Sequence, residues 1–170
     1  MNTTVSDLTE QKHRVDSFLV MESRLLDERR FEDWIELFLP DGYYWVPARP
    51  EQQDPWSEVS LMFDDREIMN NRIQRLRHPK VFAQLPHSRA VRQVSNTCID
   101  NMDAASGEIT VRSVFFMLEH RPTLPQPIER IFAGHSVHHL RPDGDSFKIA
   151  RKKVMLANCD AAFEPLFLYF

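Results

Sequence analysis

The sequence of 170 residues is poor in glycine and cysteine, with 4 and 2 respectively. It contains no glycine-rich phosphate loop and no G-x-S-x-G or Cys/His nucleophile pattern, so catalysis is only weakly indicated. Cys98 and Cys159 form no C-x-x-C motif, which argues against a disulfide framework and a cysteine-rich metal site. We expect both to be plain buried thiols.

The sequence also lacks long hydrophobic runs and an excess of basic charge. The longest apolar runs, residues 114–118 and 166–170, are far shorter than the roughly 18 residues that span a membrane. Residues 1–10 are polar and acidic, unlike a secretory signal, which favours the cytoplasm. A formal net charge of −4 with scattered basic residues predicts no nucleic-acid partner.

What is present is the composition of an ordinary globular protein, with 42% hydrophobic and 27% charged residues. A chain of this length can remove roughly 70% of its unfolded-state surface from water, so a sizeable core can form without disulfides. We expect a single domain over residues 1–170, with residues 1–10 as a flexible N-terminal arm.

Helical periodicity dominates the first part of the chain. Asp7 and Glu10 have capping-box spacing, and apolar residues then recur at helical intervals from Val15 to Leu26. A second apolar stripe over residues 31–38 predicts another helix, which the Pro-Asp-Gly sequence at residues 40–42 would end.

A strand, a loop, a second strand and a third helix are expected next. Residues 43–46 are aromatic and β-branched, and residues 59–63 alternate as in a half-buried strand. Asp64 and Glu67 have capping-box spacing for a helix that His78-Pro79 would end.

Long β-like runs follow residue 88, at residues 90–99, 108–119, 128–140 and 146–156. The turn-like sequences between them suit connections between antiparallel strands. Helices first and strands later predict the α+β class, with the helices packed on a long, strongly twisted antiparallel sheet.

The run at residues 109–118 is apolar on both faces. A monomer needs to bury only one face, so the second is expected to meet helices, to close over a pocket or to meet another subunit. The apolar segment at residues 163–170 favours another subunit, because such a tail is a liability unless it is docked.

The segment His135-Ser136-Val137-His138-His139 suggests a metal site, but a strand fits it better than a helix because a turn follows at residues 142–145. On a strand, His135 and His139 share a face but lie about 13 Å apart, too far to chelate one ion. Neither facial-triad nor Rieske-type spacing is present. We therefore expect no iron on this chain.

Glu22 occupies the apolar stripe of the first helix. It is either a general acid or base in an apolar cavity or, the interpretation we favour, a buried partner of an arginine or a tyrosine hydroxyl. Asp41 leaves the same choice, although its usual role beside a glycine is to shape the turn. A polar row on the strand after residue 88 faces either a partner or solvent: Arg89, Arg92 and Asn96.

Several motifs stand in order along residues 15–170. Residues 25–47 read L-L-D-x3-F-x2-W-x2-L-F-x2-D-x2-Y-x2-P. They are followed by E-V-S-L-M-F-D-D-R at 58–66, R-x2-R-x2-S-N at 89–96, F-A-G at 132–134 and F-K-I-A-R-K-K-V-M-L at 147–156. In this order and spacing they resemble the small (beta) subunits of aromatic-ring-hydroxylating dioxygenases.

The resemblance implies a cystatin-like or NTF2-like cone, in which helices pack on a strongly curved antiparallel sheet. It also implies a non-catalytic role with no cofactor on this chain. In that family the alpha subunit carries a Rieske [2Fe-2S] cluster and a mononuclear iron, and dihydroxylates an aromatic compound with electrons from a reductase or ferredoxin. The beta subunit supports assembly, typically as an α3β3 hexamer.

The loop at residues 50–58 is most similar to the benzoate and anthranilate branch, which implies an aromatic acid as substrate. The sequence departs from the family at residues 135–139, where histidines replace an arginine-rich continuation after Gly134. Local contacts to the partner are therefore expected to differ.

Under this interpretation the subunit interface is expected at Arg89, Arg92, Asn96, Phe163, Phe167, Tyr169 and Phe170. Deletion of residues 163–170 should then impair assembly more than it impairs the core. The alternative is a stand-alone dehydratase or isomerase of the same cone-shaped fold, with Glu22 or Asp41 as general base.

Overall fold

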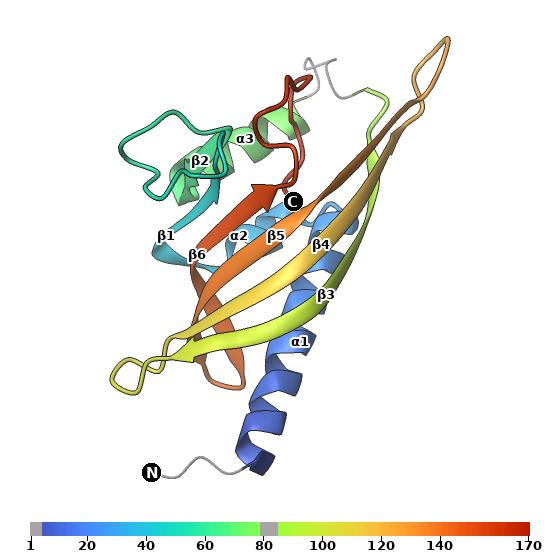
Figure 1. The fold of residues 1–170 in the computed structure, drawn as a ribbon. Helices are drawn as coiled ribbons and strands as arrows, with labels where there is room; N and C mark the ends of the chain where they lie inside the picture. Colours follow the sequence, from blue (N-terminus) through green and yellow to red (C-terminus); the bar gives the residue numbers. More distant parts are fainter. Residues whose placement is uncertain (1–4, 79–84) are drawn as a thin grey trace.

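The computed structural model describes residues 5–78 and 85–170 (Figure 1). It is an α+β protein with the expected order of helices before long strands. The helices and strands are α1 (Val5–Asp27), α2 (Phe31–Ile35), β1 (Phe38–Val46), β2 (Met62–Asp65), α3 (Arg66–Arg77), β3 (Arg89–Met102), β4 (Ile109–Arg121), β5 (Ile128–Asp143) and β6 (Ser146–Leu156). Within the described ranges, no helix is both long and apolar enough to cross a membrane.

One sheet of six strands has the order β2-β1-β6-β5-β4-β3. The four long strands, β3 to β6, pair antiparallel with one another and match the expected runs closely. The expectation of a purely antiparallel sheet is wrong at one place, because β1 pairs parallel to β6. The chain enters β1 directly from the helices. At this entry the amide of Ile149 in β6 donates to the carbonyl of Leu37, 2.7 Å away, which helps to fix the register between β1 and β6.

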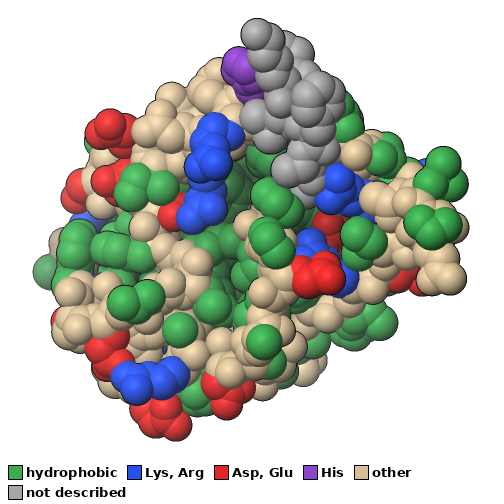
Figure 2. Space-filling model, turned by 90° about the horizontal axis from the view of Figure 1, so that it is seen from above, with side chains coloured by type: hydrophobic (Ala, Val, Ile, Leu, Met, Phe, Trp, Pro, Cys, Tyr) green, Lys and Arg blue, Asp and Glu red, His purple; other side chains and the backbone are tan. Residues whose placement is uncertain are grey.

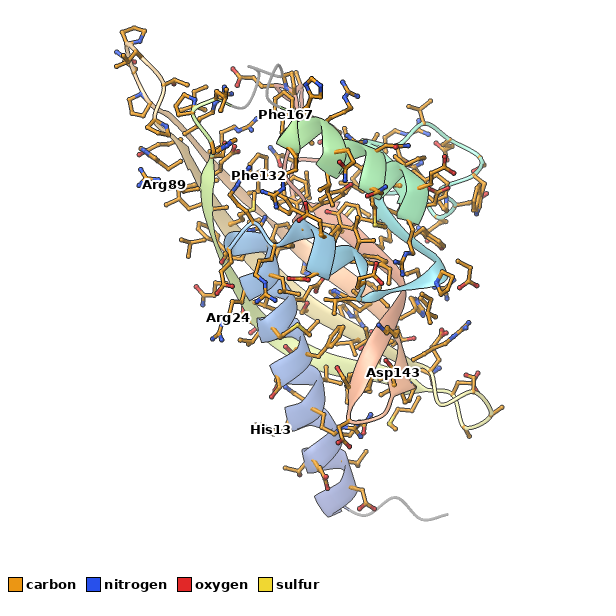
Figure 3. The ribbon with its side chains drawn as sticks, turned by 180° about the vertical axis from the view of Figure 1, so that it is seen from behind. His13, Arg24, Arg89, Phe132, Asp143 and Phe167 are labelled. Carbon is orange, nitrogen blue, oxygen red and sulfur yellow. The ribbon has the colours of Figure 1, made fainter. Side chains whose placement is uncertain are left out.

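The helices cover one face of the sheet, which we call the inner face. Figure 1 shows α1 behind β3 and β4, and Figure 3, seen from behind, shows it in front of them. The buried residues of α1 recur at helical spacing and join the same core as those of α2, α3 and the sheet: Val15, Phe18, Leu19, Leu25 and Leu26. The opposite, outer face is the one turned toward the viewer in Figure 1.

The second expected helix is too long. α2 ends at Ile35, and Phe38 starts strand β1, which continues through the Pro-Asp-Gly sequence at residues 40–42. Phe38 is buried as the apolar stripe requires, but a strand places it there. A Cβ on Gly42 would lie 2.8 Å from the carbonyl oxygen of Ile149, so glycine permits the close approach of β1 to β6.

The start of the chain also differs from the expectation, because α1 begins at Val5 and residues 5–10 are helical rather than an arm. The N-cap of α3 is Asp65, whose side chain accepts from the amide of Ile68, and not Asp64. The second strand begins only at Met62.

Cys98 is exposed on β3, contrary to the expected buried thiol, whereas Cys159 is buried.

Candidate functional site

A buried charge cluster centred on Glu22 lies on the inner side of the sheet. One oxygen of Glu22 accepts hydrogen bonds from Trp34 Nε1 (3.1 Å) and Lys152 Nζ (2.8 Å). The other lies 3.0 Å from His138 Nε2. The side chains of Glu22, His138 and Lys152 are each at most 5% exposed. Glu22 is thus a buried partner, but of lysine, histidine and tryptophan rather than of an arginine or a tyrosine.

The electrostatics of this cluster oppose a role in proton abstraction. Burial alone would raise the pKa of Glu22, but the charges of Lys152 and His138 and their hydrogen bonds outweigh it and hold the pKa well below its ordinary value. Burial lowers the pKa of Lys152 and of His138, while Glu22 acts in the opposite direction on both. A carboxylate held so firmly in its ionised form is a poor general base at neutral pH.

The C-terminal segment occupies the space beside this cluster. The amide of Phe170 donates to Tyr44 Oη 3.0 Å away, and its carbonyl accepts from Lys152 Nζ at 2.7 Å. The Phe170 ring lies 5.0 Å from the ring of Phe132, between centroids. The inside of the cone is therefore filled by the chain itself at the place where Glu22 points.

Tyr169 is held by a second set of buried polar contacts. Its hydroxyl donates to Asp64 (3.0 Å), whose carboxylate, 1% exposed, also binds Arg72 at 2.5 Å. The backbone carbonyl of Tyr169 accepts a hydrogen bond from the guanidinium of Arg92, which also forms an ion pair with Asp27 at the end of α1. These contacts tie the tail to the helices as well as to the sheet.

The expected interface residues are separated by the structure. Tyr169, Phe170 and the side chain of Arg92 are buried within this chain, so they present no side-chain surface to a partner. Arg89 and Asn96 are exposed. Asn96 has a φ of 52° and lies at a register shift in β3, so the regular alternation that would place it on the same face as Arg92 is interrupted.

Phe163 and Phe167 are partly buried and keep some exposed surface. Asp41 is exposed on β1 and takes no part in the Glu22 cluster. The two carboxylates proposed for an enzyme therefore do not share a pocket.

The three histidines of residues 135–139 are divided between the two faces of β5. His138 points inward to Glu22, whereas His135 is exposed on the outer face. His139, also outward, lies 3.2 Å from Glu108 and 3.2 Å from Arg151. Within the described ranges, no group of three or more His, Cys, Asp or Glu side chains could hold a metal ion.

The outer face carries exposed hydrophobic side chains in neighbouring strands. Four of them, which we call the outer patch, are exposed by 41–68%: Val91, Phe116, Leu118 and Ile131. The strand register places Leu118 opposite both Val91 and Ile131, so these three form one row across β3, β4 and β5. The pattern of β4 predicted part of this surface, but Val91 and Ile131 were not singled out, although alternation in β3 and β5 points to them.

The charged side chains show no comparable concentration on the side seen in Figure 2. Basic and acidic side chains are interspersed there between hydrophobic ones, and neither sign dominates the view. On this side of the molecule, charge therefore does not mark a binding surface.

Comparison with known proteins gives a consistent result. Residues 21–161 match the family model described as ring hydroxylating beta subunit. The benzoate 1,2-dioxygenase subunit beta of Acinetobacter baylyi is 29% identical over 163 residues, which cover 93% of each chain.

Solved structures confirm the cone-shaped, NTF2-like fold. The beta subunit of benzoate 1,2-dioxygenase from Burkholderia mallei superposes with a TM-score of 0.67 at 24% identity, covering 93% of each chain. A proposed scytalone dehydratase from Novosphingobium aromaticivorans has a TM-score of 0.60 at 17% identity, covering 89% of this chain and 86% of that one. The same fold thus serves subunits and enzymes, so the residues of the site must distinguish the two.

Proposed function

Because the chain belongs to the family of ring hydroxylating beta subunits, we propose that its own task is assembly with the alpha subunit of an aromatic-ring-hydroxylating dioxygenase. The complex is an oxidoreductase, and this chain is its small subunit. The alpha subunit would carry the Rieske [2Fe-2S] cluster and the mononuclear iron, and a reductase or ferredoxin would supply electrons. We expect an α3β3 hexamer in the cytoplasm, built on a single domain of this chain.

The observation that carries this proposal is the contrast between the two faces of the sheet. The inner side is closed by Tyr169 and Phe170, and its carboxylate Glu22 is paired with Lys152. The outer side leaves large hydrophobic side chains in water, with Val91 68% and Ile131 62% exposed. Contiguous exposed apolar surface of this kind marks a place where proteins associate.

The outer patch can be only part of the contact. A stable obligate interface commonly buries more than roughly 2,000 Å² in total, so the alpha subunit has to cover much more of the outer face than four side chains. Four exposed or partly exposed residues outside the outer patch also belong to the proposed interface: Arg89, Asn96, Phe163 and Phe167. Arg92, Tyr169 and Phe170 support it only indirectly, through the core.

The substrate we propose is an aromatic acid. This rests on the similarity to the beta subunit of a benzoate 1,2-dioxygenase over nearly the whole chain. The stand-alone dehydratase or isomerase is not favoured, since Glu22 is ion-paired beside the tail and Asp41 is exposed.

The interface is tested by charge substitutions in the outer patch. Val91→Glu and Ile131→Glu are expected to reduce co-purification with the alpha subunit at least about tenfold, because a buried, unpaired carboxylate costs several kcal/mol. The matched control is Val20→Glu, at a valine on α1 that is 56% exposed. The measurement is the mass and iron content of the complex after size-exclusion chromatography, together with thermal unfolding of each isolated variant.

Normal complex formation by both outer-patch variants would remove the outer face as the interface. An equal loss in Val20→Glu would point to a general effect of the added charge.

A further inference from the structure

A pocket of about 190 Å³ opens on the outer face of the sheet, where β1, β5 and β6 run side by side. Its apolar walls include Tyr43 and Trp45 from β1 and Val137 from β5. Arg151 and Lys153 from β6 add two basic groups to the same lining. The pocket thus combines aromatic walls with two neighbouring cations.

These two cations differ from most basic residues of the sheet, because neither has a carboxylate within 4.0 Å in the part of the chain that the structure describes. Lys153 Nζ donates to the carbonyl of Gln52 (3.0 Å) and lies 4.2 Å from the centroid of the Trp45 ring. Arg151 Nη2 lies 3.2 Å from His139 Nδ1. By contrast, Arg112 on the same outer face is paired with Asp100 at 2.6 Å.

Among the described residues, the carboxylate contacts of this region go to other groups. Glu108 lies against His139, which lines the pocket, and is shared between that imidazole and Arg141. Partial burial lowers the pKa of Lys153, and burial together with the charge of Arg151 lowers the pKa of His139. A carboxylate entering the pocket would gain charge-assisted hydrogen bonds from cations that have no carboxylate partner within the described residues.

The size of the pocket favours a single side chain. Sites for small organic ligands commonly enclose about 300–1,000 Å³ and bury most of the ligand, whereas this pocket is smaller and open to solvent. It also continues the proposed interface, because Val137 lies on the same outward side of β5 as Ile131 of the outer patch.

We propose that this pocket receives an aspartate or glutamate side chain of the alpha subunit, with its carboxylate between Arg151 and Lys153 and its methylene groups against Trp45 and Val137. The inference rests on the proposed function and deepens it, since it states the chemistry of one contact. It adds charge complementarity beside the apolar outer patch, and such contacts give an interface its specificity and register.

The test compares Arg151→Gln with Arg112→Gln, which removes the same charge from the same face outside the pocket. The purified alpha–beta complex of each variant is diluted, and its dissociation constant is measured by mass photometry at low and high salt. Arg151→Gln is expected to weaken the complex at least about tenfold and to reduce its salt dependence. Arg112→Gln should change the dissociation constant by less than about twofold.

Two further variants separate charge from structure. Arg151→Lys keeps the charge and should retain most of the affinity, whereas Lys153→Gln should weaken the complex as Arg151→Gln does. Equal dissociation constants for Arg151→Gln and Arg112→Gln would overturn the proposal. If Val91→Glu disrupts the complex while Arg151→Gln does not, the proposed interface stands and the pocket contact fails.

A small aromatic acid is the other possible occupant, and benzoate serves as its probe. We expect no saturable change in tryptophan fluorescence when benzoate is added to the isolated chain. Saturable binding that Arg151→Gln abolishes, with assembly unchanged, would assign the pocket to a small ligand and overturn the proposal.

Discussion

At the scale of single residues, the hydrogen-bond and ion-pair partners of Glu22 decide whether this carboxylate has a structural or a catalytic role. A carboxylate in an apolar stripe is compatible with catalysis or with structure, and its partners distinguish the two. Here Lys152 and His138 meet it at 2.8 and 3.0 Å, and Trp34 donates a third hydrogen bond. These contacts join both helices of the N-terminal part to β5 and β6, so the cluster holds the cone together.

Glu22→Gln is expected to lower the free energy of unfolding by about 3–5 kcal/mol, because it leaves the buried Lys152 ammonium without its counter-charge. Urea unfolding of the isolated chain measures the change. The control is Glu36→Gln, which removes a 70% exposed carboxylate from its pair with Arg66 and should cost less than about 1 kcal/mol. Similar losses in both variants would contradict the structural role of Glu22.

His138 predicts a loss of stability on mild acidification. Burial lowers its pKa below the ordinary 6.5, and its Nδ1 has no hydrogen-bond partner among the described residues. The unfolded state therefore binds the proton more readily, so stability is present above about pH 6.5 and declines as the pH falls below it. The lowered pKa of Glu22 adds a further loss below its ordinary value of 4.5.

The measurement is the melting temperature of the isolated chain between about pH 5 and 8. His138→Gln should make the decline below pH 6.5 shallower, because it removes the fully buried one of the two histidines, His138 and His139, whose pKa is lowered. His135→Gln is the matched control, as that histidine is exposed on the other face of the same strand and should leave the profile unchanged. Identical profiles for both variants would refute the assignment to His138.

At the scale of elements, the C-terminal segment behaves as part of the core. Leu168, Tyr169 and Phe170 are at most 6% exposed and belong to the main hydrophobic cluster. Deletion of residues 163–170 should therefore damage folding at least as much as assembly, which corrects the expectation drawn from the sequence. The reason is that the tail docks inside its own chain, where Tyr44 and Lys152 hold its backbone.

Phe170→Ala should destabilise the isolated chain by about 3–5 kcal/mol, since it removes a buried ring and leaves a cavity. Phe167→Ala is the control, because that ring is only partly buried and its loss should cost markedly less. Both are measured by urea unfolding. If the two losses were equal, the tail would not be docked as described.

At the scale of the whole molecule, the sheet separates two surfaces with different tasks. Helices and the tail close its inner face, and its outer face offers apolar side chains beside a basic pocket. In a fold that also serves enzymes, filling the inside and exposing the outside favours a subunit over a catalyst.

The assembly predicts what this chain carries when it is purified. A tagged copy of this chain, purified from its native host, should co-purify with a larger subunit. The eluate should be brown, show Rieske-type absorption and contain iron. The same chain expressed alone should be colourless and free of iron. A colourless eluate without a companion from the native host would argue against the proposed assembly.

The sequence by itself determined the α+β class and the four long strands, because period-two alternation and turn residues act between near neighbours. It also placed Glu22 inward, and its motifs identified the family. The tertiary structure alone decided the partners of Glu22, which lie 116 and 130 residues away at His138 and Lys152.

The parallel pairing of β1 with β6, the end of α2 at Ile35 and the docking of the tail were likewise decided by the tertiary structure. In each case the local sequence is compatible with two conformations or two partners of similar free energy. Contacts with residues far away in the sequence select one of them, and the local sequence does not show which residues those are.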